Sequence, residues 1–109
     1  MDLPPSGTVL GRLSDLPDPG GREAGWEATS LFLVRKGSDV RCFVNICPHA
    51  GRALSLPDGR VFVHKGEYIL CPVHGATFEL LSGTCTGGPA GDPLTAVPVR
   101  LVGDVICAA

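Results

Sequence analysis

CPHAG at residues 47–51 and CPVHG at residues 71–75 are the stretches that decide the fold of this sequence. Each pairs one cysteine with one histidine, follows an apolar run (residues 43–46 and 68–70) and continues into a small-residue step of alanine and glycine. Apolar runs of this length predict strands, and the glycines predict turns. We therefore expect two matching loops, each delivering one thiol and one imidazole to a shared point.

The residues in these loops are metal ligands by type. The candidates are Cys47, His49, Cys71 and His74. A cysteine thiolate is a soft donor suited to iron in a sulfide cluster, and imidazole also binds iron. Two cysteines and two histidines can also hold zinc. Zinc fingers, however, usually pair Cys with Cys and His with His along the chain, so the mixed pairs favour an iron–sulfur site.

The pattern Cys-x-His followed by Cys-x-x-His resembles the signature of the Rieske iron–sulfur proteins. The resemblance implies one [2Fe-2S] cluster per chain, with two cysteines on one iron and two histidines on the other. The implied ligands are Cys47 and Cys71 for the first iron, and His49 and His74 for the second. Residues 88–90, Gly-Pro-Ala, are similar to the family's loop that covers the cluster. The specific part of the resemblance is residues 45–91.

The sequence departs from the respiratory and photosynthetic members of that family. Those proteins carry two further cysteines that form a disulfide, where this chain has Arg52 and Val73. They also place hydroxyl groups where this chain has Ala76 and Phe78, whose side chains cannot donate a hydrogen bond. The chain therefore resembles the soluble ferredoxins of ring-hydroxylating oxygenases, and we expect a reduction potential in the lower half of the Rieske range.

The remaining sequence predicts an all-β fold, an antiparallel sandwich or barrel with a small cluster-binding subdomain of two loops. Short apolar runs alternate with turn pairs, and no stretch predicts a helix of three turns. Residues 14–25 are rich in Pro, Gly and Asp and are expected to form turns. The 109 residues are expected to form a single domain, with the cluster-binding part at about 45–91. The expected strands are 31–34, 40–46, 61–64, 68–70, 77–80, 95–101 and 105–107.

Charge and hydropathy exclude several classes of partner. The net charge is −2 with no basic stripe, so we expect no nucleic-acid binding. No apolar run approaches the roughly 18 residues that span a bilayer, and residues 1–7 do not resemble a signal peptide. We expect a soluble, cytoplasmic protein. Of the five cysteines, Cys42 and Cys107 are expected to be small buried hydrophobes and Cys85 to be structural.

The expected function is electron transfer and not catalysis. Only His64 remains outside the ligand set, so no site of two histidines and one carboxylate can hold a catalytic iron. We expect a carrier with transient partners, an electron-donor reductase and an electron-acceptor protein such as a terminal oxygenase. A small subunit of a larger oxidoreductase such as nitrite reductase, and a binding or sensing module, are the alternatives. The last alternative function is a zinc-stabilised interaction domain.

Partner docking is expected near the cluster, since an electron must leave there. Arg52 is the expected contact with the partner, and redox encounters use small, transient interfaces. The residues expected around the cluster tip are Pro48, Ala50, Arg52, Leu54, Val73 and Pro89.

Overall fold

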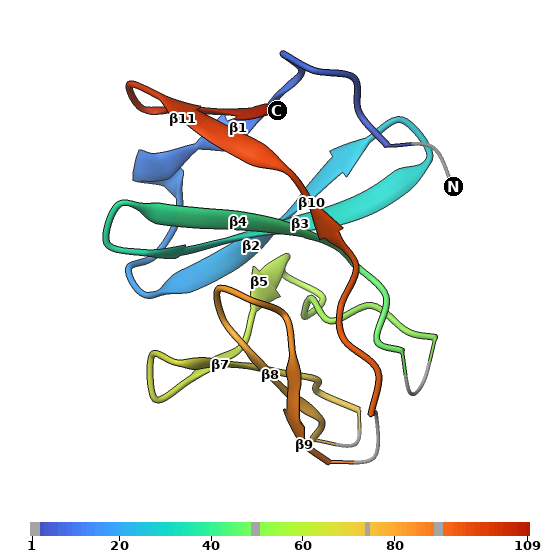
Figure 1. Ribbon diagram of the computed structural model, residues 1–109. Coiled ribbons are helices and arrows are strands. Elements are labelled where there is room, and N and C mark those ends of the chain that lie inside the picture. Colours follow the sequence, from blue (N-terminus) through green and yellow to red (C-terminus); the bar gives the residue numbers. More distant parts are fainter. Residues whose placement is uncertain (1–2, 49–50, 74, 89–90) are drawn as a thin grey trace.

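Three antiparallel sheets make up the chain in the computed structural model, which describes residues 3–48, 51–73, 75–88 and 91–109 (Figure 1). The central sheet has the order β10-β4-β3-β2-β5 and contains β2 (Gly20–Trp26), β3 (Thr29–Lys36), β4 (Asp39–Val44), β5 (Arg60–Val61) and β10 (Ala96–Val97). The upper sheet has the order β1-β12-β11 and contains β1 (Val9–Arg12), β11 (Val99–Val102) and β12 (Val105–Ala108). The lower sheet has the order β6-β7-β8-β9 and contains β6 (Val63–His64), β7 (Tyr68–Leu70), β8 (Thr77–Glu79) and β9 (Cys85–Gly87).

The all-β prediction is confirmed. The one helical element in the described part of the chain is the single 3-10 turn η1 (Leu13–Asp15). Residues 3–48, 51–73, 75–88 and 91–109 include no helix with the length and apolarity that a membrane crossing requires.

The central sheet is buried on both faces, which explains its continuous apolar runs. Successive side chains of a strand point to opposite faces of its sheet. Along β3, Leu31 and Leu33 face an upper core, while Phe32 and Val34 face a lower core. The upper core is Leu16, Leu31, Leu33, Val40, Cys42, Val44, Val97 and Ile106. The lower core is Phe32, Val34, Phe43, Cys47, Leu54, Val61, Ile69, Cys71, Ala76, Phe78, Leu80 and Leu94.

One expected turn region is a strand. Residues 14–25 were expected to form turns, but β2 runs through Gly20–Trp26 and pairs with β3 along its whole length. The glycines that suggested turns are required by close packing. A Cβ on Gly21 would lie 2.5 Å from the Leu33 carbonyl oxygen and 2.8 Å from the Val34 side chain. Glycine in a strand often marks such a close approach of the backbone.

Two expected strands are each divided between sheets. The expected strand 61–64 is interrupted at Phe62, where the chain leaves the central sheet after β5 and enters the lower sheet as β6. The expected strand 95–101 is interrupted at Pro98, which has no N–H to donate to a ladder. Strands β1 and β9 were not expected. Cys47 follows β4 of the central sheet, and Cys71 follows β7 of the lower sheet.

Candidate metal centre

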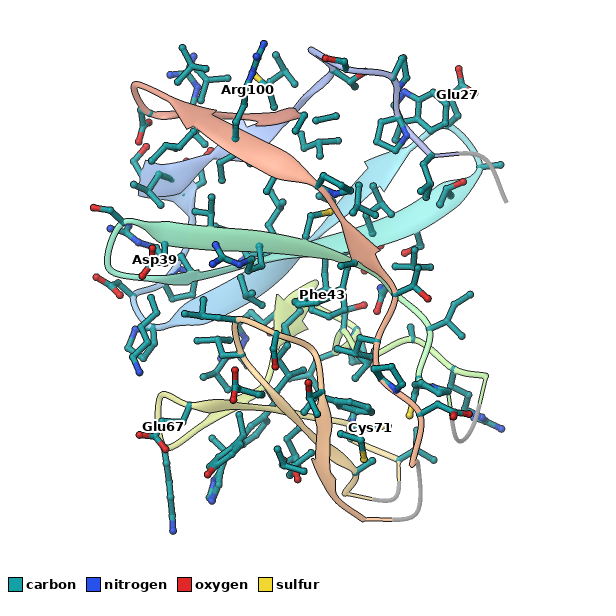
Figure 2. All side chains as sticks on the ribbon, viewed as in Figure 1. Glu27, Asp39, Phe43, Glu67, Cys71 and Arg100 are labelled. Atoms are coloured by element: carbon teal, nitrogen blue, oxygen red, sulfur yellow. The ribbon has the colours of Figure 1, made fainter. Side chains whose placement is uncertain are left out.

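Both cysteines of the proposed ligand set are buried in the same lower core. Cys47 follows the end of β4 and Cys71 directly follows β7, and each is almost fully inaccessible to solvent. Figure 2 shows Cys71 below Phe43, on the side of the central sheet that faces the lower sheet. All five cysteines lie in the described part of the chain, and no disulfide joins any two of them. Two loops that are far apart in sequence therefore bring a thiol each into one apolar region.

The two loops are closed by the same pair of backbone hydrogen bonds. In the first, the Cys47 N–H donates to the Arg52 carbonyl (2.7 Å), and the Gly51 N–H donates to the Cys47 carbonyl (2.8 Å). In the second, the Cys71 N–H donates to the Ala76 carbonyl (2.8 Å), and the Gly75 N–H donates to the Cys71 carbonyl (3.1 Å). Both loops thus span six residues, although the histidine is one position later in the second.

Glycine is needed four residues after each cysteine. Gly51 has φ 64° and Gly75 has φ 75°, in the left-handed region that residues with a Cβ rarely adopt. A Cβ would find open space at either position, so the requirement is conformational and not steric. The sequence signal of a small-residue step after each ligand pair therefore marked the point at which each loop reverses.

A third segment approaches the second loop through Gly88. A Cβ on this residue would lie 2.6 Å from the Ala76 Cα, 3.0 Å from the Ala76 nitrogen and 3.1 Å from the Gly75 carbonyl oxygen. Three residues further on, the Gly91 N–H donates to the Cys85 Sγ (3.3 Å). Cys85 is half-buried and packs against the lower core, so its structural role stays a prediction.

Substitution of Gly88 by alanine is expected to disrupt this approach. The new methyl group overlaps the Gly75–Ala76 backbone, and a φ of 80° is strained for alanine, so the two segments must separate. We expect iron to be released to a chelator faster than from the wild type. Gly37→Ala is the matched control, because Gly37 also has a positive φ but a Cβ there meets nothing. Equal release from the two variants would contradict the role given to Gly88.

The two histidines lie outside the described residues. The same is true of Ala50 and Pro89, which were expected near the cluster tip, and of Ala90 in the expected covering loop. Within the described ranges, no group of three or more His, Cys, Asp or Glu side chains is placed to hold a metal ion. The structure thus places both cysteines of the predicted ligand set in one buried core, and the ligand set itself stays a prediction.

Comparison with known proteins identifies the family. A Rieske [2Fe-2S] domain matches residues 7–98, most of the chain. The chain belongs to the Rieske [2Fe-2S] domain family. A 3-phenylpropionate/cinnamic acid dioxygenase ferredoxin subunit from Shigella boydii is 30% identical over 76 residues, which are 70% of this chain and 68% of the relative. The subunit of the same name from Escherichia coli is 30% identical over 73 residues, 67% of this chain and 65% of that subunit.

Solved structures share the fold of this Rieske domain. The ferredoxin of carbazole 1,9a-dioxygenase from Nocardioides aromaticivorans aligns with a TM-score of 0.82 at 24% identity, covering 96% of this chain and 98% of that one. A Sphingomonas yanoikuyae ferredoxin aligns with a TM-score of 0.78 at 23% identity, covering 94% and 96%. A protein titled putative nitrite reductase NADPH small subunit aligns with a TM-score of 0.72 at 23% identity, covering 96% and 99%.

The surface of this Rieske domain around the loops is part apolar and part charged. Arg52, Pro48 and Val73 are exposed, and Arg52 is the only charged side chain at the described positions of the two loops. Leu54 differs from the expectation that it lines the tip, because its side chain is fully buried in the lower core. Ile46, beside the first loop, is exposed instead.

The cysteines outside the ligand set fit the packing roles expected of them. Cys42 and Cys107 are buried, as the sequence predicted. Burial raises the pKa of Cys42 to about 12, because the thiolate is poorly solvated in the upper core. A thiol with so high a pKa is unreactive near neutral pH.

The raised pKa of Cys42 predicts a loss of stability at alkaline pH. In the unfolded chain this thiol ionises near pH 8.5, whereas in the fold it stays protonated to about pH 12. Its contribution is therefore complete below the unfolded pKa and is lost as the pH rises through the folded pKa. We expect the stability of Cys42→Ala to fall less steeply than that of the wild type between these pH values. Urea denaturation across this range measures the difference, and parallel pH profiles would refute it.

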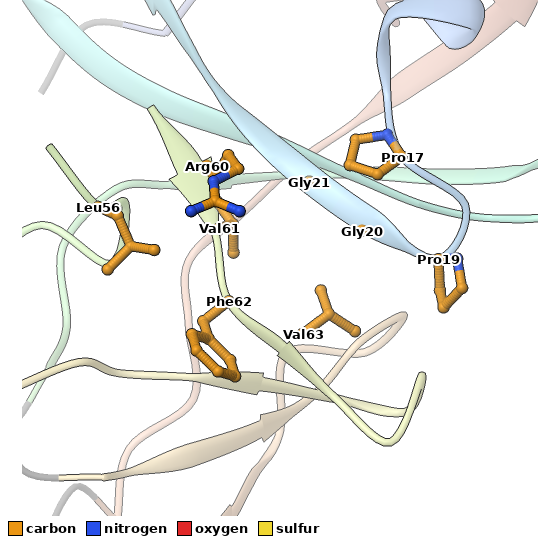
Figure 3. A pocket seen from close by; sticks show the side chains of 9 residues that line it. All are labelled: Pro17, Pro19, Gly20, Gly21, Leu56, Arg60, Val61, Phe62 and Val63. Carbon is orange, nitrogen blue, oxygen red and sulfur yellow. The ribbon is translucent and has the colours of Figure 1, made fainter. Parts of the chain in front are cut away.

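One surface cavity of the described chain is not part of the metal centre. It measures about 250 Å³ and lies between the start of β2 and the β5–β6 connection (Figure 3). Arg60 is its only charged lining residue, and neither Cys47 nor Cys71 contributes to its wall. Its lining is Pro17, Pro19, Gly20, Gly21, Leu56, Arg60, Val61, Phe62 and Val63.

Sequence reasoning missed one residue beside the centre. Asn45 lies two positions before Cys47, inside a stretch that was expected to be strand, and it is the buried polar side chain of the described core. The available signal was a polar residue between Val44 and Ile46, in an otherwise apolar run. A buried polar group must be hydrogen-bonded, so such a residue predicts a specific network.

Proposed function

We propose that one [2Fe-2S] cluster is held by Cys47 and Cys71 on one iron and by His49 and His74 on the other. The observation that carries this proposal is the pair of identically closed loops, which place both cysteine thiols in the lower core. The donor set fits the group, because soft thiolates and imidazoles are the ligands of a Rieske centre. When bound, the cluster supplies a centre that accepts and releases single electrons.

The chain's own residues shield and orient the ligands. Leu54, Ile69 and Phe78 are fully buried in the core that contains the two cysteines, and this apolar packing excludes water from the core side of the site. The hydrogen bonds within each loop hold the backbone at Cys47 and Cys71. Figure 1 shows the described ends of both loops on the side of the molecule opposite the upper sheet, where a partner can approach.

The whole chain, residues 1–109, is proposed to act as one electron carrier between a reductase and a terminal oxygenase. Relatives named as ferredoxin subunits of a dioxygenase support this assignment. One solved structure with the same fold is titled as a complex of reduced oxygenase and oxidized ferredoxin in carbazole 1,9a-dioxygenase. We place Arg52 at the contact with the partner, because it is exposed beside Cys47 and bears the charge of that loop.

Stopped-flow spectroscopy tests this function. The protein, reduced by a ferredoxin reductase, is mixed with an oxidised Rieske oxygenase, and bleaching and recovery of the cluster absorption are followed. A carrier gives complete reoxidation that accelerates with oxygenase concentration. A binding or sensing module gives no concentration-dependent reoxidation, and this outcome would reject the carrier assignment.

A role as the small subunit of a nitrite reductase is the second candidate. The favouring observation is the similarity in fold to the protein titled as such a subunit, along 99% of its length. A permanent subunit co-elutes with its large partner when the native complex is purified, whereas a diffusible carrier elutes at the size of the single chain. The size of the native species on gel filtration therefore separates the two functions.

The reduction potential is expected to lie in the lower half of the range of about −150 to +300 mV that Rieske centres cover. Ala76 and Phe78 are fully buried next to the second loop and have no hydroxyl to donate to a cluster sulfur. Fewer donors leave the added negative charge less stabilised. Voltammetry measures the midpoint, and a value above about +150 mV would contradict the argument. Ala76→Ser, which adds a donor, is expected to raise it.

A further inference from the structure

We propose that Asn45 is a positioning residue that holds the first ligand loop closed and so sets the place of Cys47. The inference rests on the proposed function only in taking Cys47 as a ligand. Asn45 is 3% exposed and follows the last residue of β4. Its side-chain Oδ1 accepts hydrogen bonds from the Leu54 N–H (2.7 Å) and the Ser55 N–H (3.3 Å). One side chain thereby joins the two ends of the loop.

Comparison of the two loops shows why a side chain is needed here. The second loop is continued by the β7–β8 ladder, in which Ile69, two residues before Cys71, is the register partner of Phe78, seven residues after it. The corresponding residues of the first loop are Asn45 and Leu54. No named strand contains Leu54, so no such ladder continues the first loop. The Asn45 amide oxygen therefore accepts the backbone N–H groups of residues 54 and 55.

The Asn45 amide is itself held in one orientation. Its Nδ2 donates to the Ser30 Oγ (3.1 Å) and the Ser55 Oγ (2.9 Å). The Ser55 hydroxyl in turn donates to the Glu23 Oε2 (2.9 Å). The amide thus donates two hydrogen bonds and accepts two, which is its full capacity. Rotating the amide by half a turn would set its NH₂ against the Leu54 N–H. The network extends from the surface of β2 to the base of the loop.

The closure bears on the metal centre through two residues. The Leu54 N–H donates to the Asn45 side chain, and Leu54 is fully buried in the same core as both cysteines. Cys47 lies between Asn45 and Arg52 in the chain, and the Cys47 N–H donates to the Arg52 carbonyl. Losing the Asn45 acceptor leaves a buried N–H unpaired, and the loop must open to reach water. The position of Cys47 then becomes less defined.

The test compares Asn45→Leu with Ile106→Ala in the holoprotein. Leucine matches asparagine in size and removes every hydrogen bond, while Ile106→Ala makes a hole in the upper core, away from the loops. We expect Asn45→Leu to speed hydrogen exchange of the segment 53–56 by about tenfold or more, and to speed iron release to a chelator. It is also expected to broaden the electron paramagnetic resonance signal of the reduced protein. Ile106→Ala is expected to leave all three readings close to the wild type.

A second variant guards against failure to fold. The double variant Ser30→Ala and Ser55→Ala keeps Asn45 and removes only the two hydroxyls that accept from its Nδ2. Its exchange rate, iron release and signal width are expected to lie between those of the wild type and Asn45→Leu. The proposal is overturned if Asn45→Leu, or the double variant where Asn45→Leu does not fold, exchanges at 53–56 no faster than Ile106→Ala. The exchange reading does not depend on the type of cluster. An all-sulfur spectrum of the wild type would therefore reject the proposed function and leave the closure tested separately.

Discussion

Replacing Cys71 with alanine is expected to abolish cluster binding while Cys42→Ala leaves it intact. The two residues are matched, because each is a cysteine with a 1% exposed side chain. They differ in location, since Cys71 lies in the lower core at the base of a loop and Cys42 lies in the upper core. Removing a thiolate ligand leaves one iron with an open position. We expect less than about a tenth of the wild-type iron and acid-labile sulfide in Cys71→Ala.

Metal and sulfide analysis after anaerobic reconstitution gives the answer, together with the visible absorption of the cluster. Circular dichroism of the same samples shows whether each variant is folded. A folded Cys71→Ala protein with wild-type iron content, or a Cys42→Ala protein that has lost its iron, would show that the ligand assignment is wrong. Cys47→Ala is expected to behave as Cys71→Ala does.

Truncation of Phe78 to alanine is expected to destabilise the protein by about 3–5 kcal/mol. Phe78 is fully buried in β8, in the core that contains both cysteines, so its truncation leaves a cavity in that core. Phe62→Ala is the control, because Phe62 is 46% exposed at the wall of the surface cavity, and the loss there should be under about 1 kcal/mol. Urea denaturation followed by circular dichroism measures both.

The same pair of variants separates packing from ligand placement. We expect Phe78→Ala to release iron to a chelator faster than Phe62→Ala, since Phe78 belongs to the core that contains both cysteines and Phe62 lines the surface cavity. Similar losses of stability in the two variants would mean that packing in the lower core does not stabilise the protein as proposed.

The fold was predictable where local pattern decides it. The apolar run at residues 31–34 predicts a buried strand, and β3 is such a strand because both of its faces are covered. The glycine-rich segment 20–26 was missed, because glycine in a turn and glycine in a tightly packed strand look alike in sequence. What distinguishes them is the approach of Leu33 and Val34 to Gly21, a tertiary fact.

The candidate site also has a part that the sequence predicts and a part that depends on tertiary contacts. Its ligand pairs could be found because each cysteine and its histidine are neighbours in the chain, with a reversing glycine close behind. For Asn45, its place in an apolar run signals a hydrogen-bonded side chain but not its partners, because Leu54, Ser55 and Ser30 come from other segments of the chain. Its role depends on the absence of a strand ladder behind the first loop. No property of residue 45 alone contains that information.

The identity of the ligands on the second iron is the central claim, and electron–nuclear double resonance of the dithionite-reduced protein tests it most directly. We predict coupling to two histidine nitrogens, assigned by ¹⁵N-histidine labelling, with one coupling missing in any cluster retained by His49→Cys and the other in His74→Cys. A reduced cluster with no histidine nitrogen coupling would contradict the account.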